Sequence, residues 1–375
     1  MLAAGMSSGT AYAYTYSVTN LGLYTNNGAR MLAVNNIGQM GGFSTVSLSS
    51  TKTAITSSAV PSITITNLHT QGGALLGGYS GSYAAGINES GQVVGQALRT
   101  NITAYVPFIA ANGGTMIEIN PLGGTAGGTA RDINNAGQVV GGAYTAGNTA
   151  NHAYVYNTSN SSGTDIGALI TGSTTSEAFA INDAGQVAGA YNTPGYAQRA
   201  FLYSNGSATD LGTLGGTNAK ATGINDAGKV VGWSYTAGNA AIHAFQYSGG
   251  VMSDIGTLAG GRTEANGINN AGQIVGWSAV ANIYGQTAFL YQNGVMTNLN
   301  SLIDPASGWT LVDAYAISNT GYIVGSALNY NGTVGAAVIL TPAVLNAVPE
   351  PETYALLLAG LGLVGFAVRR RASTY

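Results

Sequence analysis

The sequence predicts an all-β fold, namely a seven-bladed β-propeller of four-stranded blades. Three observations predict it: a turn motif that recurs seven times, a composition that favours strands, and an offset in strand phase between the two ends of the chain. The motif is clearest at residues 221–232, where ATGINDAGKVVG indicates strand, tight turn and strand. Successive copies are 43 to 53 residues apart, which predicts repeats that stack to bury their apolar faces. The residues that mark the seven turns are Asn35, Asn88, Asn134, Asn182, Asn225, Asn269 and Ser318.

The composition supports strands and limits the classes of function. The 375 residues include 57 glycines and 22 tyrosines, and only 7% are charged. Tyr, Thr, Val and Ile favour strands. The formal net charge of −3 provides no basic surface for nucleic acid, and the lack of cysteine excludes a disulfide framework and thiolate metal sites. We therefore expect neither a nucleic-acid partner nor a cofactor.

Each repeat is expected to contain four short strands. In one repeat these are residues 199–203, 208–211, 221–225 and 229–234. Asn205-Gly206 between two alternating runs is a strong hairpin signal. In the longer turn, Gly228 suits a left-handed position and the Asn225 side chain can bond the turn backbone. Four strands in a period of this length are typical of a propeller blade, so the recurring Asn and Gly have a structural explanation.

The two ends of the chain predict how the ring closes. Residues 14–22 look like a second strand that lacks its first, and residues 335–341 look like a first strand without the rest of a repeat. We therefore expect a propeller over residues 14–342, closed by the C-terminal strand pairing into the N-terminal blade, which removes an exposed edge. An open β-solenoid is the alternative, and it predicts no such offset.

Three runs in the middle of the chain resemble a known repeat family. They are His243-Ala244-Phe245, DLGTLGG at 210–216 and GINDAGKVVG at 223–232. They are similar to the extracellular repeats named for the His-Ala-Phe motif, the HAF repeat family. The resemblance is clearest over residues 130–291, while repeats one, two and seven depart from it. It implies a secreted or surface-exposed bacterial protein and implies no particular chemistry.

A set of residues rich in charge lies five positions before each turn marker. Because equivalent positions in the blades surround the axis, we expect these residues to form a ring at one mouth of the channel. Opposite charges on adjacent blades predict ion pairs of Lys220 with Glu177 and Glu264. Across the closure they predict a further pair, Asp313 with Arg30. One interpretation is a salt-bridged or solvated loop ring, and the other is a polar funnel that binds a glycan or peptide. The seven residues are Arg30, Tyr83, Thr129, Glu177, Lys220, Glu264 and Asp313.

Other patterns of catalytic or metal-binding residues are weak. The three histidines are His69, His152 and His243, and the last two occupy the same position in different repeats, so no metal site is expected. No nucleophile elbow indicates a serine hydrolase. Glycoside cleavage needs two carboxylates about 5–9.5 Å apart, which only the ring acids would supply near the channel.

The acids in the turns, Glu89, Asp183 and Asp226, are isolated in sequence and form no dense calcium-binding ladder. No glycine-rich phosphate loop of the strand–loop–helix kind is found either. These turn acids therefore predict neither a calcium site nor a nucleotide site.

The first 13 residues read as the remnant of a signal peptide or leader. They lack a basic start and a full apolar core, but Ala11-Tyr12-Ala13 is a small-x-small cleavage pattern. The alternative is an unstructured leader in which this pattern arises by chance.

The end of the chain has a different composition. A linker at 343–348 precedes Pro349-Glu350-Pro351, an apolar run of 14 residues at 355–368, and Arg369-Arg370-Arg371. A standard spanning helix needs about 20 residues, so a short apolar helix followed by arginines favours a transient membrane stop with the positive charge on the cytoplasmic side.

The order of these parts over residues 349–375 resembles the PEP-CTERM sorting signal. The resemblance implies export across the inner membrane of a Gram-negative bacterium and cleavage near 349–351 by an exosortase-type transpeptidase. It also implies a bacterium that makes extracellular polysaccharide. A plain C-terminal membrane anchor is the alternative.

Three functions follow from these patterns. The first is a non-enzymatic surface or matrix protein that acts as a structural or binding module of biofilm or exopolysaccharide. The second is a secreted glycan-active enzyme that uses the channel carboxylates Glu177, Glu264 and Asp313. The third is a lectin-like propeller with one weak sugar site in each blade. Repeated polar residues favour the third function over the second, because catalysis needs a unique cluster.

Overall fold

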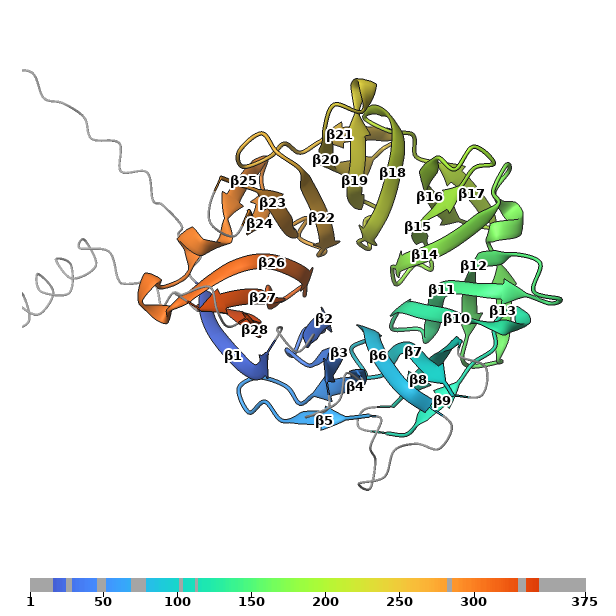
Figure 1. Ribbon diagram of the computed structural model, residues 1–375, viewed down its shortest axis with the longest axis horizontal. Coiled ribbons are helices and arrows are strands. Elements are labelled where there is room, and N and C mark those ends of the chain that lie inside the picture. Colours follow the sequence, from blue (N-terminus) through green and yellow to red (C-terminus); the bar gives the residue numbers. More distant parts are fainter. Residues whose placement is uncertain are drawn as a thin grey trace, which may run out of the picture. The chain divides into compact units, whose positions relative to one another are not determined.

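A computed structural model of the chain describes residues 16–24, 29–45, 52–68, 79–100, 104–111, 114–281, 285–329 and 335–343. In this part of the chain, 28 strands form seven antiparallel sheets of four strands each. Residues Tyr16–Thr341 form one compact unit, in which the sheets stand as blades around a central axis (Figure 1). The predicted all-β, seven-bladed propeller of four-stranded blades is therefore confirmed.

Each blade runs from an inner strand beside the axis to an outer strand at the rim. From inner to outer, blade 1 contains β2 (Arg30–Val34), β3 (Met40–Thr45), β4 (Lys52–Ser57) and β5 (Ile65–Asn67). Blade 2 contains β6 (Tyr79–Ile87), β7 (Val93–Arg99), β8 (Tyr105–Ala110) and β9 (Met116–Glu118). Blade 3 contains β10 (Gly123–Ile133), β11 (Gln138–Thr145), β12 (Asn151–Asn157) and β13 (Ser162–Asp165). Blades 4 and 5 are β14 (Thr175–Ile181), β15 (Val187–Asn192), β16 (Gln198–Ser204) and β17 (Ser207–Asp210); β18 (Gly215–Ile224), β19 (Val230–Thr236), β20 (Ile242–Ser248) and β21 (Val251–Asp254). Blades 6 and 7 are β22 (Thr263–Ile268), β23 (Ile274–Ala279), β24 (Gln286–Gln292) and β25 (Val295–Asn298); β26 (Trp309–Ile317), β27 (Ile323–Asn329), β28 (Gly335–Pro342) and β1 (Tyr16–Tyr24).

Pairing of the two chain ends closes the ring, but in the reverse sense to the prediction. The N-terminal strand β1 pairs with the C-terminal strand β28 at the outer edge of blade 7. The expected pairing of the ends is therefore present, whereas the expectation that the C-terminal strand completes the N-terminal blade is wrong. Either arrangement covers one edge of a three-stranded sheet, so the phase offset in the sequence predicts closure without deciding which blade is shared.

The predicted repeat is out of frame with the blade. The strands expected over residues 199–234 correspond to β16 and β17 of blade 4 followed by β18 and β19 of blade 5. The turn motif therefore joins the two innermost strands of one blade. A repeating sequence contains the same four strands in any frame, and only sheet pairing shows where each blade begins.

Seven hydrophobic clusters fill the spaces between the blades, each with residues of two neighbouring blades. Between blades 4 and 5, for example, Ala200 and Leu211 pack with Ala221 and Phe245. Phe245 is fully buried, and burial of such a side chain stabilises the fold by about 2–3 kcal/mol. The aromatic run of each repeat thus supplies the core between blades.

The glycine that ends each Val-Val-Gly run has a specific steric cause. A Cβ at Gly232 would lie 2.0 Å from the backbone oxygen of Lys220, and one at Gly276 would lie 2.0 Å from that of Glu264. Both contacts are with the inner strand of the same sheet. These glycines therefore allow the inner strand of their own blade to approach closely.

The helical segments of the described residues are short 3₁₀ turns: η3 (Gly167–Leu169), η4 (Ala237–Asn239), η5 (Leu299–Leu302) and η6 (Pro305–Ser307). Within the described ranges, no helix has the length and apolar character to cross a membrane. The expected leader 1–13, the linker residues 344–348, the apolar helix 355–368, the sorting segment 349–375 and His69 lie outside the described residues.

Candidate functional site

The inner strands line a central channel, and each of them carries a β-bulge three residues before its turn marker. In β14, for example, Ala178 pairs with Gly189 and Ala180 with Ala188, so that Phe179 is left unpaired. The seven bulged residues line a hollow of about 200 Å³ inside the channel. They are Leu32, Ala85, Arg131, Phe179, Thr222, Asn266 and Tyr315.

Sequence reasoning missed this bulge layer. Its members share no residue type, because a bulged residue is selected for its backbone position and not for a partner in the ladder. The one signal that could have found it is the constant offset of three residues from the turn marker.

The predicted ring residues lie in the inner strands, but they contact different partners from those expected. Glu177 accepts hydrogen bonds from Thr129 Oγ1 at 2.8 Å and from Arg131 Nε at 2.7 Å, both in the preceding blade. The Nζ of Lys220 lies 3.8 Å from the centre of the Phe179 ring. Burial lowers the pKa of Lys220, which the negative charge of Glu177 partly offsets.

The remaining ring residues also contact close neighbours. Glu264 pairs with Arg262, which directly precedes the strand of Glu264. The guanidinium of Arg30 lies 5.5 Å from the centre of the Tyr315 ring, across the closure of the propeller. Tyr83 packs edge-to-face on Phe43 and Tyr105. Asp313 accepts a hydrogen bond of 2.9 Å from Asn266 Nδ2.

Among the described residues, no ion pair joins Lys220 to Glu177 or Glu264, and none joins Arg30 to Asp313. The expected pairs are therefore wrong. The bulge layer explains this result, because it places the aromatic rings of Phe179 and Tyr315 next to the two cations.

Two buried carboxyl groups in the channel wall have raised pKa values. Burial raises the pKa of Asp313 to about 7, and the positive charge of Arg30 only partly opposes this rise. Burial raises the pKa of Asp132 to about 6, although its oxygens accept hydrogen bonds from the N–H groups of Ile133 and Ile181.

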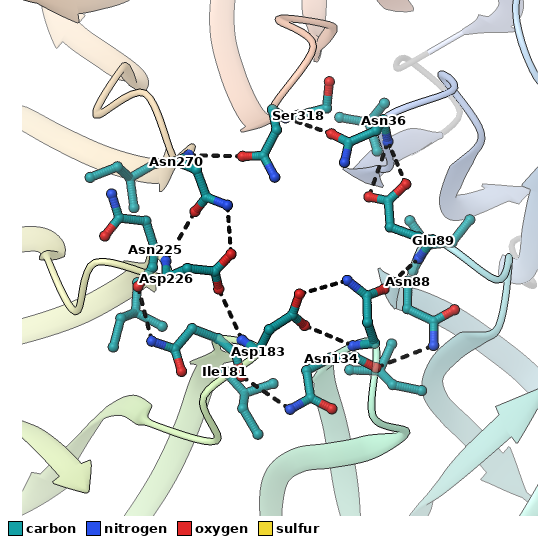
Figure 2. A pocket seen from close by; sticks show the side chains of 18 of the residues that line it. Asn36, Asn88, Glu89, Asn134, Ile181, Asp183, Asn225, Asp226, Asn270 and Ser318 are labelled. Atoms are coloured by element: carbon teal, nitrogen blue, oxygen red, sulfur yellow. Dashed lines mark hydrogen bonds between the residues drawn. The ribbon is translucent and has the colours of Figure 1, made fainter.

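One mouth of the channel is bordered by a cyclic chain of hydrogen bonds, which we call the turn ring (Figure 2). The backbone N–H of the residue after each turn marker donates to the side-chain oxygen of the equivalent residue in the next blade, at 2.7–3.2 Å. The last bond runs from Asn319 N to Asn36 Oδ1, across the closure between blades 7 and 1. The seven members are Asn36, Glu89, Asn135, Asp183, Asp226, Asn270 and Asn319.

The turn markers form a second, buried set of contacts beneath the turn ring. Asn182 is representative: its Oδ1 accepts from Gln186 N at 2.9 Å, and its Nδ2 donates to Gln186 Oε1 at 2.8 Å and to the carbonyl of Asn225 in the next blade at 2.9 Å. In six blades the marker is Asn, and its Nδ2 donates to the carbonyl of the marker in the next blade. In blade 7 the marker is Ser318, and Thr320 instead donates to the Asn36 carbonyl at 2.7 Å.

The prediction that the marker Asn bonds its own turn backbone is confirmed, but the sequence did not reveal the bond to the next blade. The signal for it was present, because an Asn, Asp or Glu follows every marker. Spacing along the chain cannot show that such a side chain reaches the next repeat.

The turn ring brings together three acids that looked isolated in the sequence. Asn135 Nδ2 donates to Asp183 Oδ2 at 2.7 Å, and Asn36 N donates to both oxygens of Glu89. Asp226 Oδ2 accepts from Asn270 Nδ2 in the same way. Since all three carboxylates accept from neighbouring blades, this end of the channel joins the blades together. Its hollow has a volume of about 160 Å³.

The repeated histidines also bond within their own blades. His152 Nδ1 lies 2.9 Å from Asp165 Oδ1, and His243 Nδ1 lies 2.6 Å from Asp254 Oδ2. In blade 4 the same positions hold Arg199 and Asp210, which form an ion pair of 3.0 Å. These pairs tie each third strand to its outer strand, and no group of metal-ligating residues is found in the described part of the chain.

A protein-family model for the PEP-CTERM protein-sorting motif matches residues 347–371. The predicted sorting signal is therefore confirmed, while the HAF repeat resemblance stays an expectation from the sequence. The chain is thus a seven-bladed propeller with a sorting motif at its C-terminal end. This motif marks the protein for export to the cell envelope or surface and for recognition by an exosortase.

A search of curated proteins finds no match to this sequence. Among solved structures, the β-propeller domain of the Trilobed protease from Pyrococcus furiosus is similar, with 7% identity, a TM-score of 0.49 and coverage of 81% of this chain and 92% of that one. A putative TolB from Agrobacterium tumefaciens shows 10% identity and a TM-score of 0.42, covering 69% and 90%. Virginiamycin B lyase from Staphylococcus aureus shows 12% identity and a TM-score of 0.44, covering 85% and 100%.

Proposed function

We propose that this protein is a non-enzymatic binding or structural module of a biofilm or exopolysaccharide matrix, located outside the cell. The observation that carries the proposal is the sorting motif at residues 347–371, attached to a ring that its own two ends close. The last sheet contains strands from both ends of the chain, so the first and last blades are held together by strand pairing. Such a closed ring suits a protein that must persist outside the cell.

The proposed route crosses the inner membrane of a Gram-negative bacterium. The apolar run 355–368 holds the chain in the membrane for a short time, and an exosortase-type transpeptidase cleaves near residues 349–351. The run has 14 residues and is followed by Arg369, Arg370 and Arg371, which suits a temporary stop with the positive charge inside the cell. Retention as a plain membrane anchor is the alternative outcome.

The test of this route compares the producing bacterium with a strain that lacks its exosortase. We expect the C-terminus of the protein from the culture medium or cell surface, determined by mass spectrometry, to lie near residue 350. In the mutant strain, or when the three terminal arginines are replaced by alanine, the uncleaved protein should accumulate in the membrane fraction. Lys229→Ala removes a positive charge from the propeller and is the matched control. Mature protein that still carries residues 369–371 would overturn the proposed cleavage.

The proposed partner is extracellular polysaccharide. Co-sedimentation of the purified protein with exopolysaccharide from the same strain should deplete it from the supernatant, while a cytosolic protein of similar size stays in solution. Exported protein that fails to co-sediment would leave the sorting route intact and would exclude the matrix partner.

A glycan-active enzyme is the less favoured alternative. It requires the carboxylates of Glu177, Glu264 and Asp313, each of which contacts a neighbouring side chain: Arg131, Arg262 and Asn266, respectively. The residues described as lining the channel hollow include none of these three acids. Release of reducing sugar from the same exopolysaccharide, lost in Glu264→Gln, would favour this alternative.

A further inference from the structure

A pocket opens between blades 3 and 4, at the ends of the strands farthest from the turn ring. We call it the blade 3–4 pocket, and its volume is about 260 Å³. The pocket arises from small residues at one position in the second strand of a blade. This position pairs with the residue of the predicted charged ring in the inner strand. Trp233 and Trp277 occupy this position in blades 5 and 6, whereas Gly142 and Ala190 occupy it in blades 3 and 4. The seven residues at this position are Phe43, Gln96, Gly142, Ala190, Trp233, Trp277 and Ser326.

Several polar groups that line the pocket have no bond to the rest of the protein. Within the described residues, the amides of Asn151 and Gln198 and the hydroxyl of Tyr144 form no side-chain hydrogen bond. Asn192 Nδ2 donates to Thr175 Oγ1 at 2.9 Å, and the side-chain Oδ1 of Asn192 accepts no hydrogen bond among the described residues. These side chains come from β11, β12, β15 and β16, so strands of two blades direct them to one space.

The carboxylate of Glu177 lines the pocket, and one of its two oxygens already has partners in the protein. Its Oε1 accepts from Arg131 Nε and Thr129 Oγ1, which leaves Oε2 without a protein donor among the described residues. The ring of Phe179 provides an apolar wall in the same pocket, and Lys220 Nζ lies 3.8 Å from the centre of that ring. The pocket therefore combines one aromatic ring, one free carboxylate oxygen, three amides and a phenol.

The loop that borders the pocket carries an exposed aromatic side chain. Residues 193–197 connect Asn192 to Gln198, both of which line the pocket. Tyr196 in this loop is 90% exposed and has a φ of 62°. A bulky residue rarely adopts this left-handed conformation, and water is an unfavourable surrounding for its ring. Both features suit a ring that packs on a bound partner.

The blade 3–4 pocket contrasts with the hollow between blades 2 and 3, which has a similar volume of about 240 Å³. There Arg99 pairs with Glu118 at 2.6 Å, and Tyr79 Oη donates to the same carboxylate at 3.0 Å. Asn120 accepts from the N–H of Gly123. In that hollow these polar side chains already form hydrogen bonds or ion pairs within the protein. The two spaces therefore have similar volumes but differ in how many of their polar side chains are free.

We propose that the blade 3–4 pocket binds one pyranose ring of a neutral glycan. Each sugar hydroxyl both donates and accepts, and amides placed beside a carboxylate oxygen offer both functions to neighbouring hydroxyls. The apolar face of a sugar ring fits against an aromatic wall. The volume lies just below the range of about 300–1,000 Å³ for drug-sized ligands, which suits one ring and not an extended chain. The free Oε2 of Glu177 disfavours an acidic sugar.

This inference deepens the proposed function, on which it rests for the extracellular origin of the glycan. The site itself rests on the pocket residues alone. Binding by the purified full chain is therefore measured separately from sorting: a failure of export leaves the binding result unchanged, and a failure to bind sugar leaves the sorting result unchanged.

The experiment titrates the full chain with the methyl pyranosides of glucose, galactose and mannose, and with glucuronate as the charged comparison, using ligand-observed NMR and calorimetry. We expect at least one neutral pyranoside to bind at least tenfold more tightly than glucuronate. Gln198→Ala should weaken binding at least fivefold, whereas Gln286→Ala, at the equivalent position in blade 6, should leave it unchanged.

A second variant fills the pocket. Ala190→Trp places an indole where blades 5 and 6 already hold one, and it should abolish binding without lowering the melting temperature. If this variant fails to fold, Gln198→Ala and Glu177→Gln decide the outcome, each compared with Gln286→Ala. The proposal is overturned if none of the neutral pyranosides binds, if glucuronate or a peptide binds more tightly, or if binding survives in these pocket variants.

Discussion

The turn ring and the blade 3–4 pocket, which lie at opposite ends of the blade strands, differ in what their polar side chains do. At the turn ring, the side-chain oxygens of Asp183 and its equivalents accept hydrogen bonds from neighbouring blades, and the marker amides such as Asn182 are fully bonded. At the blade 3–4 pocket, the side chains of Tyr144, Asn151 and Gln198 form no hydrogen bond within the described residues. In this propeller the polar side chains of the turn ring and of the turn markers hold the blades together, whereas those of the pocket are free to bind a ligand.

The largest expected effect is on the stability of the fold and comes from Asp313 in the channel wall. Burial raises the pKa of Asp313 to about 7 from an ordinary value of 3.8. The folded protein thus binds this proton more tightly than the unfolded chain, so the stabilising contribution is complete below pH 3.8 and is lost as the pH rises towards 7. Between pH 5 and pH 8 the contribution of Asp313 to the free energy of unfolding should fall by about 3 kcal/mol.

Urea unfolding of the wild type and of Asp313→Asn at these two pH values checks the prediction. The variant should retain only the smaller decrease due to Asp132, whose pKa is raised to about 6. Equal pH dependence in the two proteins would show that Asp313 is not the responsible group.

The next largest effect on stability comes from comparing a substitution at the turn ring end with one at the pocket end. Asn182→Ala removes the donor to the Asn225 carbonyl and the acceptor of the Gln186 N–H, both at a buried position. Leaving such groups unpaired costs about 1–3 kcal/mol, so the midpoint of urea unfolding should fall clearly.

The matched change at the pocket end is Asn192→Ala, which should alter stability by less than about 0.5 kcal/mol. Asp183→Asn is a conservative control within the turn ring, since four of its seven members are already Asn. If Asn192→Ala were as destabilising as Asn182→Ala, the contrast between the two ends would be incorrect.

The smallest effect concerns the loop beside the pocket. Tyr196 has a φ of 62°, which glycine adopts without strain. Tyr196→Gly should therefore raise the free energy of unfolding by about 1 kcal/mol and, at the same time, weaken binding of the neutral pyranoside about two- to fivefold. Thermal unfolding and the same NMR titration measure the two quantities. A variant that is more stable and binds equally well would show that Tyr196 does not contact the ligand.

The sequence predicted more about the fold than about the site. Seven turn markers and the offset between the chain ends were sufficient for the number of blades and for pairing of the two ends, because each follows from counting strands. The frame of the repeat and the blade that β1 completes were predicted wrongly, because a periodic sequence is compatible with several strand pairings. The ring from Arg30 to Asp313 was found as a set of positions, but its expected ion pairs are absent among the described residues, since bulged side chains lie next to the cations.

By itself, the sequence determined a closed seven-bladed propeller with a sorting motif at residues 347–371. Periodic strands and local motifs are encoded by neighbouring residues, so they can be recognised along the chain. The tertiary structure alone decided that Asn36 and its equivalents form one hydrogen-bonded circle and that Ala190 leaves room for a ligand beside Glu177. Both features depend on side chains about 50 residues apart in sequence that meet only when blades stack, because stacking is what brings equivalent positions of successive repeats into contact.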